Sequence, residues 1–215
     1  MGLFRMLLIG VALIVSLPIA AFVFLALRFQ YTLLKGTKTK RNLGLDDPIW
    51  SLEEYQRLFA HRKWAHIESF ACAKEIPLSR IRRSLLQSQE GLVSEVFRVV
   101  WNRRVNMQSG GAPSDVAPTV GSRSQSSDIR AEVVGITPQE MSMAITTVHT
   151  NFTGGLETVT VEINPSADVM IVTFKYLWHN DIILPRKWKQ WLGVYMQLTS
   201  RRMWLLDLAA ALTSQ

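Results

Sequence analysis

Several patterns that identify common classes of protein are missing from this 215-residue sequence. It has one cysteine, Cys72, so it can form no intramolecular disulfide, although exported domains often use disulfides. It has no phosphate-binding loop, dinucleotide-binding glycine pattern, zinc-protease motif, paired-cysteine motif or nucleophile elbow. The sequence therefore gives no catalytic signature, and it predicts no cofactor.

The few histidines do not indicate a metal site. They are His61, His66, His149 and His179. The first two are five positions apart, which would place them about 140° apart around a helix rather than on one face. His179 precedes Asp181 by two residues and could form an acid–base pair with it, but the Asn between them favours a turn instead. We expect no metal ligands.

The stretch Met6–Leu27 contains no charged residue. About 20 apolar residues are enough to cross the hydrocarbon core of a bilayer. We predict one transmembrane helix here, kinked at Pro18, which membrane helices tolerate. A cleaved signal peptide is the alternative, because Met1–Arg5 forms a short basic start. The apolar run is longer than the about 7 to 15 residues usual in signal peptides, so we favour a retained anchor.

Basic residues follow this apolar run, whereas only Arg5 precedes it. The residues just after it that we expect to contact anionic lipid headgroups are Arg28, Lys35, Lys38, Lys40 and Arg41. This bias predicts a single-pass protein with its N-terminus outside and its C-terminal domain in the cytoplasm or an equivalent inner compartment. The net charge of +7 fits an anionic membrane surface. Nucleic acid is a less favoured partner, because no known binding module is visible.

Composition divides the chain into five segments. These are the anchor 1–27, a basic neck 28–50, a helical segment 51–107, a flexible linker 108–128 and a C-terminal region 129–215. In the helical segment, a start signal at Ser51 predicts a helix over Leu52–Lys74. A second amphipathic helix is expected over Arg80–Arg104. The linker is rich in Ser, Gly, Pro and Thr and has few large apolar residues.

The C-terminal region has strand-like patterns separated by turn residues. The expected strands cover Arg130–Ile136, Glu140–Thr150, Leu156–Ile163 and Val169–Trp178. Apolar and polar residues alternate in the third, so one of its faces should be buried. Consecutive strands joined by short turns predict an antiparallel meander.

A long helix is expected after Pro185, with a wide apolar arc that could cover the meander. Helices on one face of an antiparallel sheet make an α+β fold. On this helix Trp204 falls among polar residues and Arg202 falls inside the apolar arc. With Lys189, they are our candidates for contact with a partner or a lipid. A buried arginine needs a carboxylate, for which Glu157 and Glu162 are candidates.

Three hypotheses of function follow. The first is a non-catalytic, membrane-tethered interaction or assembly subunit that docks on other subunits of a membrane complex. The second rests on element order over Arg130–Gln215, which resembles the helix-grip layout of lipid-transfer domains; the resemblance implies a pocket for a lipid or another apolar ligand between helix and sheet. The third is an enzyme near the membrane that uses His179 and Asp181. The missing motifs make the third the least favoured.

Overall fold

The computed structural model describes residues 24–25, 28, 30–32, 34–60, 66–109, 114–147, 153–180 and 187–213. Contacts divide the chain into two compact units, Met1–Gly36 and Thr37–Gln215. Among the helices in the described part of the chain, none is both long and apolar enough to cross a bilayer. The predicted anchor Met6–Leu27 lies outside the described residues except for Phe24 and Leu25. Its existence stays a prediction.

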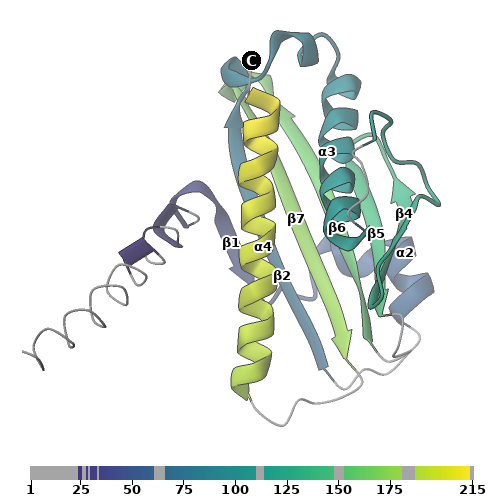
Figure 1. The fold of residues 1–215 in the computed structure, drawn as a ribbon. Coiled ribbons are helices and arrows are strands. Elements are labelled where there is room, and N and C mark those ends of the chain that lie inside the picture. The colour runs from purple at the N-terminus through teal and green to yellow at the C-terminus, as the bar shows by residue number, and fades with distance from the viewer. Residues whose placement is uncertain are drawn as a thin grey trace, which may run out of the picture. The chain divides into compact units, whose positions relative to one another are not determined.

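The second unit is built on a seven-stranded sheet (Figure 1). The strands are β1 (Lys38–Arg41), β2 (His66–Pro77), β3 (Arg123–Gln125), β4 (Ile129–Ile136), β5 (Glu140–Thr147), β6 (Thr153–Asn164) and β7 (Val169–Asn180). Their order across the sheet is β1-β2-β7-β6-β5-β4-β3, and every neighbouring pair is antiparallel. The predicted meander is confirmed, and it extends from β3 to β7.

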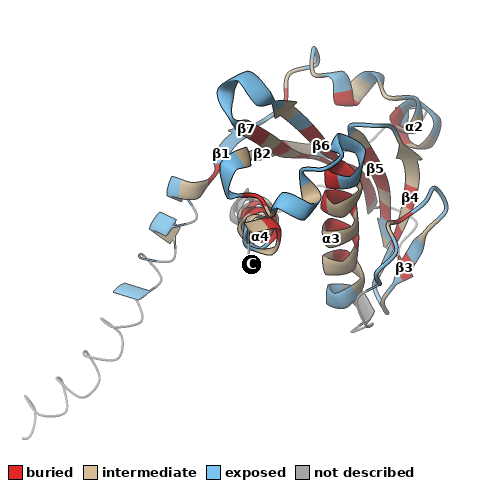
Figure 2. Cartoon of the chain, turned by 90° about the horizontal axis from the view of Figure 1, so that it is seen from above, coloured by how far each residue is buried: buried red, intermediate tan, exposed pale blue. Residues whose placement is uncertain are grey.

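Two long helices, α3 (Gln89–Ser109) and α4 (Lys187–Thr213), lie along the same face of the sheet (Figures 1 and 2). Side chains from the sheet that face them include Phe70, Val159 and Phe174, all fully buried. The helices contribute Val96, Leu205 and others to the same core. This arrangement confirms the α+β class and the long C-terminal helix.

The opposite face of the sheet is covered in part by residues 43–59. They form a short 3-10 helix η1 (Pro48–Ser51), the short helix α2 (Glu53–Tyr55) and a π-helical turn η2 (Gln56–Ala60). The apolar side chains of this layer, among them Tyr55 and Phe59, pack against Leu156 and Leu177 of the sheet. The sheet is therefore buried on both faces at this end.

The predicted helix over Leu52–Lys74 is wrong in its second half. Residues from His66 onward form β2, which pairs with β7 along its whole length. Phe70, Cys72 and Ile76 are buried at positions two and four apart, which places them on one face of a strand. Alanine, lysine and glutamate favour helix here, but pairing with a central strand outweighs such local preference.

The second predicted helix exists but begins nine residues later than expected. Short 3-10 turns η3 (Leu78–Arg80) and η4 (Arg83–Leu85) precede it. The hydroxyl of Ser88 accepts a hydrogen bond from the Gly91 N–H at 3.2 Å, close to the first residue of α3. The expected cap Ser79 instead donates its N–H to Asp168, which lies in the turn between β6 and β7. Tertiary contact therefore replaces the expected cap.

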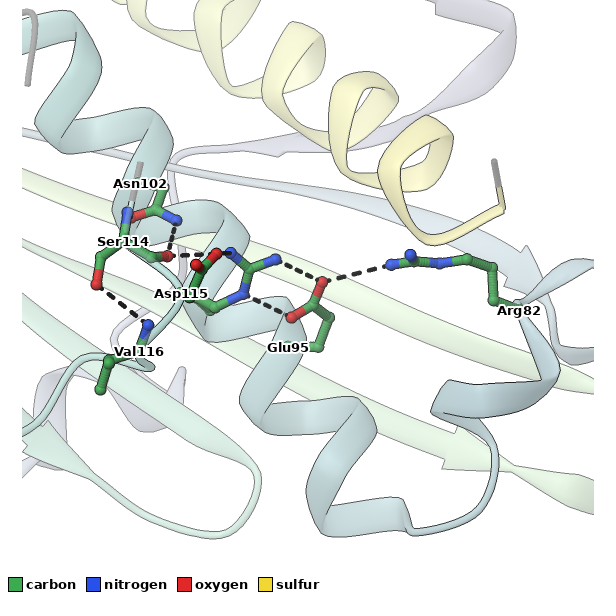
Figure 3. A network of polar contacts seen from close by, with 7 residues as sticks. Arg82, Glu95, Asn102, Ser114, Asp115 and Val116 are labelled. Atoms are coloured by element: carbon green, nitrogen blue, oxygen red, sulfur yellow. Dashed lines mark hydrogen bonds and ion pairs between the residues drawn. The ribbon is translucent and has the colours of Figure 1, made fainter. Parts of the chain in front are cut away.

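The predicted linker 108–128 contains the strand β3, which pairs with β4, so this part of it is not structureless, whereas its flexibility stays a prediction. Figure 3 shows how α3 binds the start of this segment. Asn102 exchanges two hydrogen bonds with the backbone of Ser114, at 2.7 and 3.0 Å. Arg98 donates to the Ser114 carbonyl at 3.0 Å and also pairs with Glu95. Polar side chains on α3 therefore bind the backbone of this segment, which has few large apolar side chains of its own to bury.

Candidate functional site

A cluster of three charged side chains lies between the two long helices and the sheet. Arg104 comes from α3, Arg201 from α4 and Glu157 from β6, and all three are buried. Both guanidinium groups donate to the same oxygen of Glu157, Oε2, and the bond from Arg201 is 2.6 Å long. The glutamate is fully inaccessible to solvent. Glu157 thus joins α3 and α4 to the middle of the sheet.

This cluster carries one more positive than negative charge. Burial alone would raise the pKa of Glu157, but Arg104 and Arg201 outweigh that effect and hold the pKa below its usual range. Burial lowers the pKa of Arg104, although an arginine remains charged near neutral pH. The three residues together therefore leave a buried excess of +1.

Aromatic rings surround the two guanidinium groups. The Cζ atoms of Arg104 and Arg201 lie 4.7 and 4.8 Å from the centre of the Trp204 ring, and Arg201 is also 5.1 Å from the Tyr176 ring centre. Cations stacked on aromatic faces at this distance are attracted by the ring quadrupole. The rings offset part of the cost of burying an unbalanced charge.

Trp204 also lines an open groove between α3 and α4. The groove has a volume of about 480 Å³ and is lined by Arg103, Asn106, Met107, Tyr195, Met196, Thr199, Ser200, Met203 and Trp204. A second hollow of about 380 Å³ shares Arg103, Asn106 and Trp204 with it and continues toward Leu208 and Ala211. The residues that line the two hollows come from α3 and α4, which contact each other and lie side by side in Figure 1.

Methionines form the exposed edges of this groove. Met107 is 60% exposed, Met196 62% and Met203 36%. Methionine is flexible and polarizable, and exposed methionines are common on surfaces that bind varied apolar partners. At the mouth, Arg103 forms a 2.9 Å ion pair with Asp207, so the charges there cancel. The groove is therefore apolar at its rim and positively charged beneath its Trp204 floor.

Another cleft, of about 640 Å³, lies at the start of α3 and is larger than the groove. Polar residues such as Gln89, Glu90, Thr137 and Gln139 supply much of its lining. It shares no lining residue with the buried charges, and it presents no comparable set of exposed apolar side chains. We therefore place the candidate site in the α3–α4 groove.

The structure corrects the expectation for Trp204 and changes the role of Arg202. Trp204 is 3% exposed rather than solvent-facing, because α4 packs against α3 as well as the sheet. Arg202 is buried as expected, but its Nη2 donates to the Thr39 hydroxyl at 2.9 Å instead of to a carboxylate. Glu157, a predicted partner of Arg202, binds the neighbouring Arg201. Lys189 lies in α4, and its side chain is outside the described part.

The predicted membrane-contact residues fall in both compact units. Arg28 and Lys35 are exposed helical residues of the first unit. Lys38, Lys40 and Arg41 lie on β1 at the edge of the sheet, also exposed, so this part of the predicted neck is a strand. Lys38 forms an ion pair with Glu75 of β2. Contact of these five residues with lipid headgroups stays a prediction.

His179 is fully buried at the end of β7, on the face of the sheet opposite the groove. Its ring stacks on Phe59 at 5.2 Å and lies 5.6 Å from Tyr55. Burial lowers the pKa of His179 to about 4. A histidine without access to solvent does not present a base to a substrate, and Asp181 lies outside the described residues. Within the described ranges, no three potential metal ligands come together.

The sequence matches no protein-family model, and no curated protein matches it. Solved structures with a similar arrangement include Mll3558 from Rhizobium loti, which has 17% identity over 67% of this chain and 96% of its own, with a TM-score of 0.40. Ara h 8.0201 has 7% identity over 68% and 99%, with a TM-score of 0.42. CV1439 from Chromobacterium violaceum has 10% identity over 68% and 98%, and a TM-score of 0.42. At these scores the matches assign neither a family nor a ligand to this chain.

Proposed function

We propose that this protein binds a lipid acyl chain in the groove between α3 and α4. The observation that carries the proposal is the concave surface of about 480 Å³ bordered by Met107, Met196 and Met203, with Trp204 in its floor. The volume lies within the range of small-molecule sites, about 300 to 1,000 Å³. Three exposed methionines around one hollow leave apolar surface in contact with water. An apolar ligand that covers this surface removes it from water, which is favourable.

The predicted anchor and basic residues would hold this groove close to a bilayer, which is a source of such ligands. Lys38, Lys40 and Arg41 are exposed on the first strand of the domain and free to face anionic headgroups, apart from the ion pair that Lys38 makes. The hypothesis of an assembly subunit rests on no contact seen in the described structure. It stays a prediction beside the one proposed here.

Photolabelling of the full chain in phosphatidylcholine nanodiscs tests the proposal. The probe is hexadecanol with a diazirine in its chain, and labelled residues are mapped by peptide mass spectrometry. We expect labels on the α3 and α4 peptides that contain Met107 and Met203. Met203→Glu places a carboxylate in the groove and should reduce their labelling about tenfold, because an apolar ligand cannot pair with the charge.

The matched control is Val120→Glu, which adds the same charge at an exposed apolar residue away from the groove. This variant should label like the unmodified chain. Labels on the groove peptides that persist in Met203→Glu, or labels spread evenly over the domain, would refute binding in the groove. Circular dichroism confirms that both variants are folded.

A further inference from the structure

We infer that the ligand of the groove is an anionic amphiphile, with its acidic end near Trp204 and its chain along the methionines. This inference rests on the proposed function and adds the chemical class of the ligand. The Trp204 side chain both lines the groove and contacts the guanidinium groups of Arg104 and Arg201. The excess positive charge of the cluster therefore lies directly behind the groove floor.

The hydrogen bonding of the cluster leaves donors unused. Because both arginines donate to Oε2 of Glu157, the Nε atoms of Arg104 and Arg201 are buried without a hydrogen-bond partner, and so is Oε1 of Glu157. A buried donor that lacks a partner costs about 1 to 3 kcal/mol. Pairing within the cluster leaves these two Nε–H donors unused in the described structure, and an anion is the kind of group that accepts from them.

A further donor without a partner lies in the groove itself. The hydroxyl of Thr199 is buried, makes no hydrogen bond and belongs to the lining. Among the described residues that line the groove, Arg103 alone is formally charged, and Asp207 neutralises it at 2.9 Å. The other lining residues are neutral, so the cluster decides the sign of the local potential. That sign is positive, and it favours a negative ligand group.

The shared chemistry of such a ligand is an acidic group at the end of an acyl chain. A free fatty acid supplies a carboxylate, and a single-chain phospholipid supplies a phosphate. Guanidinium groups bind both anions well. Arg104 and Arg201 lie behind Trp204, so they attract the acidic group through their charge, and the Thr199 hydroxyl in the lining can donate to it. We expect the acid to be favoured over the matching alcohol by about tenfold.

The experiment compares three diazirine probes with the same chain: hexadecanoic acid, hexadecyl phosphate and hexadecanol. The full chain is labelled in phosphatidylcholine nanodiscs at pH 7.4, and the yield on the groove peptides is measured. At least one anionic probe should exceed the alcohol about tenfold, and the stronger of the two identifies the source. Equal yields for all three would overturn the inference but leave the proposed function standing.

Arg104→Met tests the origin of the preference, because it leaves one arginine to balance Glu157 and removes the excess charge. The ratio of acid to alcohol labelling should fall to about one, while labelling by the alcohol is retained. Thr199→Val should also lower the ratio of acid to alcohol labelling. The control Arg98→Met removes a charge from the same helix, where Arg98 pairs with Glu95, and should keep the ratio. An unchanged ratio in Arg104→Met would refute the inference, whereas alcohol labels outside the groove would refute the proposed function itself.

Discussion

At the scale of single residues, the Arg104–Glu157–Arg201 cluster buries three charged side chains that do not balance. Buried ion pairs seldom add net stability, because desolvation offsets their attraction. Here the charges do not even balance, and both donors converge on one oxygen. An apolar side chain at each position would fill this space at lower cost. The proposed anionic ligand would give this excess charge a role in binding.

Because the cluster has two positive charges and one negative charge, removing the negative charge should destabilise the protein more than removing one positive charge. Glu157→Gln leaves two buried arginines facing each other and should lower the free energy of unfolding by about 3 to 5 kcal/mol. Arg104→Met leaves a neutral pair and should cost only about 1 to 2 kcal/mol, the value of one charged hydrogen bond and its stacking. Urea denaturation at pH 7 measures both. An equal loss in the two variants would contradict the excess of positive charge.

His179 predicts a dependence of stability on pH. Its pKa is about 4 in the folded protein, compared with 6.5 for a free histidine. The unfolded chain therefore binds the proton more readily, and stability is complete above about pH 6.5 and falls as the pH drops toward 4. The slope contributed by this single group should approach about 1.4 kcal/mol per pH unit.

The variant His179→Phe keeps the aromatic contacts with Phe59 and Tyr55 but cannot be protonated. Free energies of unfolding measured in urea from pH 7 to pH 4.5 should fall less steeply in the variant. Parallel curves for the two proteins would show that His179 does not titrate on unfolding in this range.

At the scale of elements, local pattern and tertiary pairing disagreed most in residues 66–77. The segment is rich in residues that suit a helix, yet it forms β2 next to the central strand β7. The later strands were predicted closely, because turn residues such as Asn164 and Pro165 mark their ends and alternation marks their faces. Pairing between strands about 100 residues apart leaves no such local signal.

Two glycines give opposite predictions for strand and helix. A methyl group at Gly155 of β6 would clash with the Leu177 carbonyl oxygen of β7, so Gly155→Ala should lower the free energy of unfolding by about 1 to 3 kcal/mol.

A methyl group at Gly193 of α4 meets nothing within 4 Å. Gly193→Ala should raise the free energy of unfolding by about 0.5 to 1 kcal/mol, since alanine favours helix. Chemical denaturation of both variants checks the signs, and a stabilising Gly155→Ala would contradict the close approach of β6 and β7.

At the scale of the whole molecule, the proposed function assigns a separate role to each of the two units. The first unit contains the predicted anchor, and the second contains the groove and the buried cluster. The charge bias around residues 6–27 predicts that the second unit faces the cytoplasm. A lipid-binding groove on that side would take ligands from the inner leaflet or deliver them to it.

Protease added to the cytoplasmic side of sealed vesicles tests this orientation. We expect the C-terminal domain to be degraded and the anchor to remain with the membrane. A chain that lacks residues 1–27 should be recovered in the soluble fraction. Protection from the protease, with a glycan attached at the sequon that begins with Asn151, would place the domain on the opposite side.

The sequence by itself determined the features that local chemistry encodes: the apolar run at the N-terminus, the strands from residue 129 onward and the long C-terminal helix. Alternation, turn residues and helical periodicity are properties of neighbours along the chain, so they are readable without a structure. Only the tertiary structure decided that residues 66–77 are a strand, that Trp204 is buried and that Arg104, Glu157 and Arg201 meet. Those outcomes depend on contacts between residues 44 to more than 100 positions apart. Which face of α4 meets α3 and which meets the sheet is set by packing, and packing placed the positive charge behind the groove.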